Sequence, residues 1–235
     1  MSPSTTLPDG RKVTLADEIH DRVSAEVVVA EGAAVRPEPA VQAETAALAR
    51  RLRAEHAGRR PGEIPGLQEA RKLYNAFGME PTRYRPSSEA LLRRVLQEKE
   101  ITAVNNAVDC GNLAALSFLL PLGLYDLDRV EGDVVLRVGR PGEEYPGIRK
   151  GAVHLEGRLG LFDAAGPFGS PTSDSLRTSV QAGTTRLLAV IMATAGYPPD
   201  RLAAHAGMLG DLCTRHCRAR TVVHHRLAVA TAGAP

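Results

Sequence analysis

The sequence predicts an α+β fold, and two observations support this. Segments with helical composition and spacing lie toward both ends of the chain, whereas β-branched runs bounded by glycine cluster in the middle. Helices and strands therefore do not alternate as they would in a series of βαβ units. No internal repeat is visible in the 235 residues, a length that suits one large domain or two small ones.

The first part of the chain predicts one strand and two helices. Residues 23–33 form a β-branched run that closes at Gly32, which is typical of a strand. Residues 39–56 are rich in Ala, Leu, Arg and Glu and begin with proline, which favours a helix. A glycine- and proline-rich linker at 58–66 precedes a short helix at 67–78.

The remaining elements follow from spacing and from breakers. Ser87 or Ser88 is expected to cap a helix with apolar residues at helical spacing, after an extended stretch that holds two prolines. The other expected elements are a strand at 100–104, a buried helix ending before Pro121, a strand at 132–139, a hairpin at 151–166, a loop at 166–175, a buried helix at 179–196 and a last helix at 198–221.

Composition limits the function. The formal net charge is +2, so the whole chain lacks the strong positive charge typical of nucleic-acid-binding proteins, although local patches remain open. Aromatic residues make up 4% and tryptophan is absent, so stacking platforms for bases are sparse. Three cysteines and no apolar leader segment indicate a reducing, cytoplasmic setting, and no apolar run is long enough to span a membrane.

Polar residues interrupt the apolar segment 105–128. Asn105 or Asn106 is expected to cap a helix, with Asp109 near its positive end, and Tyr125-Asp126 to close a turn. Asn112 is different, because an amide in the middle of a buried helix costs about 1–3 kcal/mol if it lacks a partner. It either bonds backbone groups or faces a polar ligand.

This segment, NNAVDCGNLAALSFLLPLGLYDLDRVEGDVVLRVGRPGEEY, resembles the B3/B4 domain of the bacterial phenylalanyl-tRNA synthetase β-subunit. FGMEPTRYRPSSEALLRRVL before it and GPFGSPTSDSLRTSVQAGTTRLL after it resemble free-standing relatives of that domain. The resemblance spans roughly residues 65–195. It implies a central, mostly antiparallel sheet flanked by helices, and a pocket that, in the synthetase, hydrolyses tyrosine wrongly attached to tRNA.

The resemblance also implies site residues. Asn112 matches a pocket amide, and Gly169 with Ser170 matches a glycine-rich wall that leaves room for a side chain. Two positions depart from the pattern: Gly123 stands where the synthetase has histidine, and Val190 stands where it has glutamate. These departures remove the obvious groups that would position a water, and the glycine is expected to enlarge the pocket.

Further substrate-binding candidates are Asn106 and Asp109 on one side of the expected pocket, and Thr172, Asp174, Arg177 and Thr178 on the other. The second group either forms a capped helix start with a solvated Asp-Arg pair, or faces the pocket. In the latter case Asp174 would bind an α-ammonium group and Arg177 a ribose or phosphate.

Basic residues suggest an RNA contact, although a charged helix face is usually only solvated. The expected RNA-binding set is Arg83, Tyr84, Arg85, Arg93 and Arg94. The basic runs 50–53 and 59–60 are weaker instances. Cys213 and Cys217 lie one helical turn apart beside His216, which suits either small buried residues or zinc; we expect neither a metal nor another cofactor.

Three functions remain open. The first is hydrolysis of mischarged aminoacyl-tRNA in trans, the second is binding of tRNA or its aminoacyl end without chemistry, and the third is binding or conversion of a free amino-acid-like molecule. Residues 1–60 are expected to pack as an N-terminal part on the B3/B4-like unit at 61–235.

Overall fold

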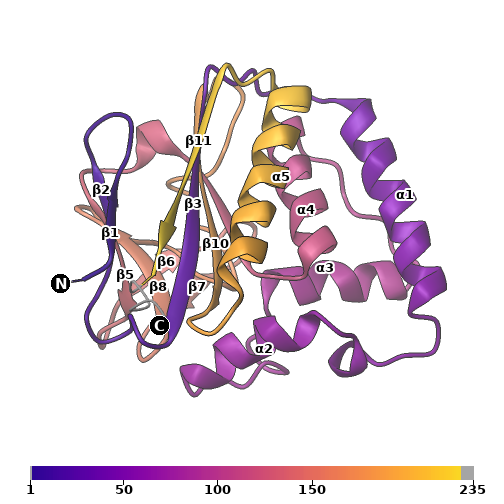
Figure 1. The fold of residues 1–235 in the computed structure, drawn as a ribbon, viewed down its shortest axis with the longest axis horizontal. Coiled ribbons are helices and arrows are strands. Elements are labelled where there is room, and N and C mark those ends of the chain that lie inside the picture. Colours follow the sequence, from indigo (N-terminus) through magenta and orange to yellow (C-terminus); the bar gives the residue numbers. More distant parts are fainter. Residues whose placement is uncertain (1, 229–235) are drawn as a thin grey trace, which may run out of the picture.

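A computed structural model of the chain describes residues 2–228 and has three layers (Figure 1). A four-stranded sheet lies in the middle, a second sheet covers one of its faces, and helices cover the other. The α+β class is thus confirmed. Most helices flank one face of the central sheet; the other face packs against the second sheet, where α2 adds Leu73 and Tyr74 to the core.

The central sheet is antiparallel throughout, in the order β11-β3-β10-β4. Its strands are β11 (Thr221–Leu227), β3 (Val23–Glu31), β10 (Arg186–Thr194) and β4 (Leu122–Asp126). The early strand β3 pairs along its whole length with β10, so the N-terminal part of the chain contributes to the middle of this sheet.

The second sheet has the order β1-β2-β5-β8-β9, with one parallel pair, β2 and β5. Its strands are β1 (Ser4–Thr6), β2 (Lys12–Leu15), β5 (Val134–Val138), β8 (Leu159–Asp163) and β9 (Gly166–Gly169). A separate ribbon joins β6 (Glu144–Pro146) to β7 (Ala152–His154).

Five α-helices lie in the described part of the chain: α1 (Pro39–Glu55), α2 (Leu67–Ala76), α3 (Ser87–Leu96), α4 (Asn106–Phe118) and α5 (Pro199–Cys217). Helices α4 and α5 pack on the central sheet, and α1 and α3 lie outside α4 (Figure 1). Short 3-10 turns occupy Pro61–Glu63 and Leu127–Arg129. All five helices were predicted within a few residues.

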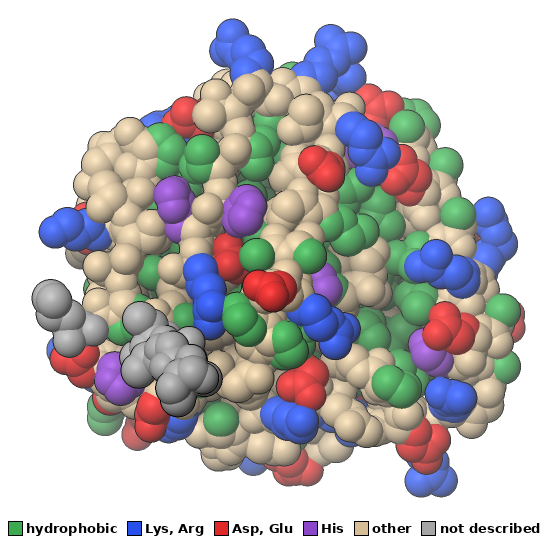
Figure 2. All heavy atoms as spheres, viewed as in Figure 1, with side chains coloured by type: hydrophobic (Ala, Val, Ile, Leu, Met, Phe, Trp, Pro, Cys, Tyr) green, Lys and Arg blue, Asp and Glu red, His purple; other side chains and the backbone are tan. Residues whose placement is uncertain are grey.

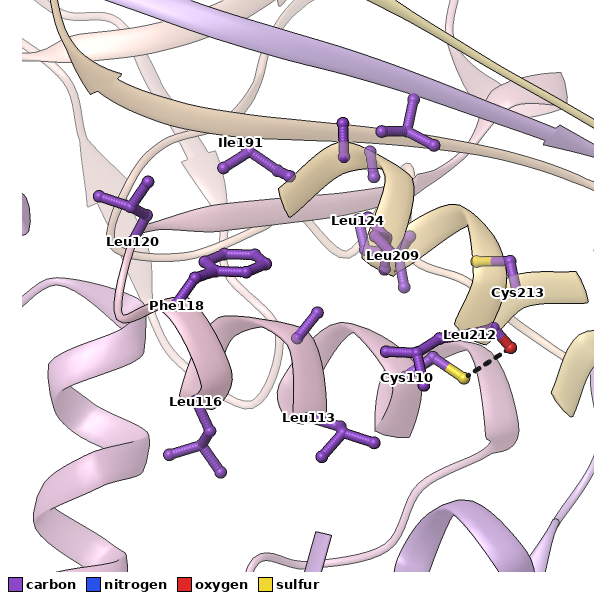
Figure 3. Close-up of a cluster of buried hydrophobic side chains, with 14 of the residues drawn as sticks. Cys110, Leu113, Leu116, Phe118, Leu120, Leu124, Ile191, Leu209, Leu212 and Cys213 are labelled. Atoms are coloured by element: carbon purple, nitrogen blue, oxygen red, sulfur yellow. Dashed lines mark hydrogen bonds between the residues drawn. The ribbon is translucent and has the colours of Figure 1, made fainter. Parts of the chain in front are cut away.

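Buried apolar side chains join α4 and α5 to the central sheet (Figure 3). Ile191 and Leu209 are fully buried there, and Leu116, also fully buried, points to the opposite side of α4. The Cys110 thiol donates a hydrogen bond to the carbonyl oxygen of Leu212 at 3.5 Å, so this cysteine belongs to the helix–helix core.

The segment 179–196 was predicted as a helix, which is wrong. It holds the strand β10, whose side chains alternate between the helix layer and the second sheet. Because both faces of a central strand are covered, the run is apolar throughout, and such a run cannot be distinguished from a buried helix by its periodicity.

Other strand predictions also need correction. Residues 100–104 form no strand, and 166–169 form β9 within the expected loop. The expected 151–166 hairpin does not form, because β7 pairs with β6 and β8 pairs with β5 and β9. Strands β1, β2, β4, β6 and β11 were not predicted. Among residues 2–228, no helix has both the length and the apolar character needed to cross a bilayer.

Candidate functional site

A cavity of about 270 Å³ lies between α3, α4, β4 and three loops. Its walls are mostly apolar, and they include Leu91, Val108, Ala115, Leu122, Leu124 and Val180. Asn112 and Asp174, both expected site residues, also line it. Val104 and Ile148, which are 49% and 38% exposed, are two further apolar residues of the lining.

Asn112 lies on the face of α4 that borders the cavity, and it is half-buried. Its side-chain amide makes no hydrogen bond to any residue in the described part of the chain. Asn112 also lines a larger neighbouring groove of about 910 Å³, so the two hollows meet at this residue. The amide therefore has both a donor and an acceptor available to a molecule that enters either hollow.

Asn106, by contrast, is fully buried and holds the fold together. Its amide nitrogen donates to the carbonyl oxygens of Ala34 and His216, each at 2.8 Å, and its oxygen accepts from the Arg36 backbone N–H at 3.0 Å. These bonds tie the start of α4 to the segment before α1 and to the end of α5. Asn106 is therefore unavailable to a ligand, and the cap of α4 is Asn105, which accepts from Val108 N–H at 2.9 Å.

Asp109 lines the groove and not the cavity. One of its carboxylate oxygens accepts from the Val104 backbone N–H at 3.0 Å, while the other is buried without a partner among residues 2–228. Burial raises the pKa of Asp109. The carboxyl group of Asp109 is therefore buried in the wall of the groove, next to the Gln42 side chain.

Asp174 lines the cavity opposite α4, and its carboxylate accepts a long hydrogen bond of 3.3 Å from Leu124 N–H. Burial raises the pKa of Asp174 to about 7. The Tyr125 hydroxyl is close enough to perturb that carboxyl group, yet no hydrogen bond of normal geometry joins the two, and the hydroxyl is buried without a partner. The cavity thus holds an acid that changes charge near neutral pH.

Gly123 and Gly169 enclose the Tyr125 ring. A Cβ atom at Gly123 would lie 2.0 Å from the tyrosine oxygen, and one at Gly169 would lie 2.1 Å from it. Side chains alternate along β4, so position 123 faces away from the cavity, and it pairs with Val190 across the β4–β10 ladder. The expectation that Gly123 enlarges the pocket is therefore wrong, because Tyr125 fills that space.

Two hydroxyls of the loop after β9 bond to tyrosines of the protein itself. The Ser170 hydroxyl accepts from the Tyr145 hydroxyl at 2.9 Å, and the Thr172 hydroxyl lies 2.7 Å from that of Tyr74. Neither side chain borders the cavity, so the structure does not bring these two predicted residues to it.

The last two predicted residues of this loop also have structural contacts. Arg177 donates to both oxygens of Asp163, at 3.0 and 2.8 Å, as a paired guanidinium and carboxylate. The Thr178 hydroxyl lies 3.0 Å from that of Ser175 and is fully buried. The expectation that Arg177 binds a ribose or phosphate in the pocket is corrected, because its bonds lie with Asp163 outside the cavity.

The predicted RNA-binding residues separate into two places. The guanidinium groups of Arg158 and Arg83 make cation–π contacts with the Tyr84 ring, at 3.8 and 5.1 Å from its centroid. Arg85 lies in the same loop as Tyr84. Arg93 and Arg94 lie at the other end of α3, where Arg94 lines the large groove. On the face drawn in Figure 2, Lys and Arg side chains are scattered among Asp and Glu and form no single patch.

No group of three His, Cys, Asp or Glu side chains in residues 2–228 is arranged to hold a metal ion. Cys213 and Cys217 are buried free thiols. Interaction with the neighbouring Cys217 side chain, followed by burial, raises the pKa of the Cys213 thiol, so this thiol stays neutral. These cysteines serve as small core residues between α4 and α5.

Sequence reasoning missed how Tyr125 relates to the site. The Gly123-x-Tyr125 spacing puts both residues on one face of a strand, which was the available signal, but β4 itself was not predicted. It also missed Ile148 and Arg149, which line the cavity from the turn between β6 and β7. No short-range sequence pattern indicates that this turn would lie next to α4.

Known proteins were compared with the chain as a whole. The B3/4 domain matches residues 69–222, and no curated protein matches. Among solved structures, an N-terminal fragment of the phenylalanyl-tRNA synthetase β-subunit from Pyrococcus horikoshii is similar, with 11% sequence identity and a TM-score of 0.44. That similarity covers 87% of this chain and 48% of the fragment, so the chain spans about half of that relative. Because the domain match covers more than half of its length, the chain belongs to the B3/4 domain family.

Proposed function

We propose that the chain binds the aminoacyl end of a tRNA in the 270 Å³ cavity and hydrolyses the ester bond in trans. One observation carries the proposal: in a B3/4 family chain, the unpartnered amide of Asn112 and the carboxyl group of Asp174 line the same apolar cavity. An aminoacyl ester needs this combination, because its side chain requires an apolar surface while its ammonium and carbonyl groups require polar partners.

The cavity residues take separate roles in this proposal. The apolar walls receive an apolar amino-acid side chain. The Asp174 carboxylate accepts from the α-ammonium group, and the Asn112 amide N–H donates to the ester carbonyl oxygen, where negative charge develops. Water adds to the carbonyl carbon, the bond to the ribose oxygen breaks, and that oxygen takes up a proton. The products are the free amino acid and the uncharged tRNA.

One observation favours a second candidate, a module that binds the aminoacyl end without chemistry. Gly123 and Val190 are paired across the β4–β10 ladder, on the side of β4 that faces away from the cavity. Neither position therefore offers an acid or base to the cavity. Hydrolysis would then depend on the substrate's own α-amino and ribose hydroxyl groups together with the oriented amide.

Release of labelled amino acid from a panel of charged tRNAs tests the proposal. We expect at least one charged tRNA to lose its amino acid faster than the buffer control. Asn112→Ala should reduce that rate by about tenfold or more, as loss of an oxyanion donor does. Asn75→Ala is the matched control, because Asn75 is an exposed helical amide on α2 that does not line the cavity.

The outcomes separate the two candidates. If no charged tRNA is deacylated above background, the hydrolase proposal is wrong. Binding of a non-hydrolysable 3′-aminoacylamino analogue that Asn112→Ala weakens would then select the binding module. Thermal stabilisation by a free amino acid, with no effect of any tRNA, would select a small-molecule function instead.

A further inference from the structure

The 910 Å³ groove beside the cavity is built in part by α1, a helix that lies outside the B3/4 match. One wall is α1, and the other is the irregular segment 98–103 that joins α3 to α4. Asp109 and Asn112 of α4 line it as well. Because Asn112 also lines the cavity, a chain lying in the groove would reach the cavity at that residue.

Four cationic side chains line this groove: Arg50, Arg53, Arg94 and Lys99. None of them forms an ion pair within the described part of the chain; Arg94 donates only to the backbone carbonyl oxygen of Glu100, at 2.9 Å. Arg53 is half-buried, whereas Arg50, Arg94 and Lys99 are exposed. The groove therefore gathers cations whose charge is not neutralised.

Acidic groups also face the groove. Glu98 and Glu100 are exposed, and Asp109 is buried with one oxygen unpartnered among residues 2–228. Four cations thus face two solvated carboxylates, while the Asp109 carboxyl group is buried. A ligand with several negative charges fits the four cations, and the half-buried Asn112 amide can bond a hydroxyl group; a ribose-phosphate chain has both kinds of group.

We propose that the groove holds the phosphodiester backbone of the single-stranded 3′ end of RNA, and that α1 is the RNA-binding element of this chain. This inference rests on the proposed function, because it supplies the path by which the terminal ribose reaches Asn112. No aromatic residue lines the groove, so the contacts are to phosphate and ribose and do not read the base sequence.

The position of the arginines on α1 allows a sharp test. Arg50 and Arg53 are three residues apart and share the groove face, whereas Arg51 is exposed on the same helix and does not line the groove. Arg50→Ala/Arg53→Ala is the test variant and Arg51→Ala is the matched control. All three residues lie at the surface of one helix, so unchanged circular dichroism and melting temperature are expected for both variants.

Binding of uncharged tRNA is measured by fluorescence anisotropy over a series of salt concentrations. We expect the double variant to weaken binding by about tenfold or more at low salt, and to reduce the slope of log affinity against log salt by about 1.4, since each single-strand phosphate contact contributes about 0.7. Arg51→Ala should change the affinity by less than about twofold.

Hydrolysis of a small aminoacyl ester without RNA, such as an aminoacyl methyl ester, separates this inference from the proposed function. We expect the double variant to cleave the small ester as the wild type does while losing activity on charged tRNA. Equal weakening by Arg51→Ala, or an unchanged salt slope in the double variant, would overturn the groove inference and leave the hydrolase proposal standing. If the wild type binds tRNA but hydrolyses neither substrate, and the double variant loses that binding, the groove inference is supported and the hydrolase proposal is wrong.

Discussion

Replacing Asp174 with asparagine is expected to stabilise the fold above neutral pH while weakening the site. Burial raises the pKa of this carboxyl group from 3.8 to about 7. Each pKa unit corresponds to about 1.4 kcal/mol, so holding the ionised carboxylate in the fold costs at most about 4 kcal/mol, because Asp174 keeps part of its surface exposed to solvent. The asparagine oxygen can still accept from Leu124 N–H, so the substitution removes the charge and keeps the local hydrogen bond.

The sign of the pH dependence follows from the raised pKa. The unfolded chain ionises Asp174 near its ordinary pKa, whereas the folded protein keeps it protonated up to about 7. The stability contributed by the protonated form is therefore complete below about pH 4 and is lost as the pH rises to about 7. Between about pH 5 and about pH 8.5, roughly 3 kcal/mol of that contribution is lost in the wild type, but none of it in Asp174→Asn.

Urea unfolding of both proteins at the two pH values measures this effect. Asp109 and Glu26, whose pKa values burial also raises, titrate equally in both proteins and cancel in the comparison. We expect the advantage of the variant to grow by roughly 3 kcal/mol from the lower to the higher pH. An advantage that is the same at both values, within about 0.5 kcal/mol, would refute the neutral form of Asp174 in the fold near neutral pH.

Three further predictions test the packing around the site. Gly123→Ala should lower the free energy of unfolding by more than about 2 kcal/mol, because the new methyl group would lie 2.0 Å from the Tyr125 oxygen. Adding Tyr125→Leu should recover part of that loss in a double-mutant cycle, and simple additivity would contradict the contact. Asn106→Ala should cost about 3 kcal/mol in urea unfolding and Asn112→Ala less than about 1, since only the first breaks buried hydrogen bonds. Similar values for the two would mean that Asn112 is also bonded. Arg177→Ala should lower stability by about 1–2 kcal/mol without changing the deacylation rate; a large rate loss at equal stability would return Arg177 to the site.

Helices were predictable because their signals are local. The proline at the start of α1, the apolar spacing of α3 and the Asn105 cap of α4 each act within a turn or two of the chain. Strands were harder, because a strand is stabilised by partners far away in sequence. Strand β10 looked like a helix for this reason: β3 and β4, which pair with it, lie more than sixty residues earlier in the chain.

The candidate site divides in the same way. The ordered motifs of residues 105–145 were enough to indicate the B3/4 family, and the position of Asn112 on a buried helix indicated an amide in need of a partner. That Asn106 would be occupied by Ala34 and His216 could not be read from its neighbours. Two adjacent asparagines have the same composition around them, and only the packing of α1 and α5 against α4 distinguishes them.

By itself the sequence indicated the five helices and the family, narrowed the cap of α4 to Asn105 or Asn106, and identified Asn112 and Asp174 as candidate site residues. The tertiary structure alone decided that these two face one cavity, that Tyr125 occupies the space beside Gly123, and that Arg50 and Arg53 join Arg94 along one groove. The physical reason is the difference in sequence separation over which the two kinds of interaction act. Propensity and capping act between neighbours in the chain, whereas strand register and helix packing determine which distant side chains share a surface.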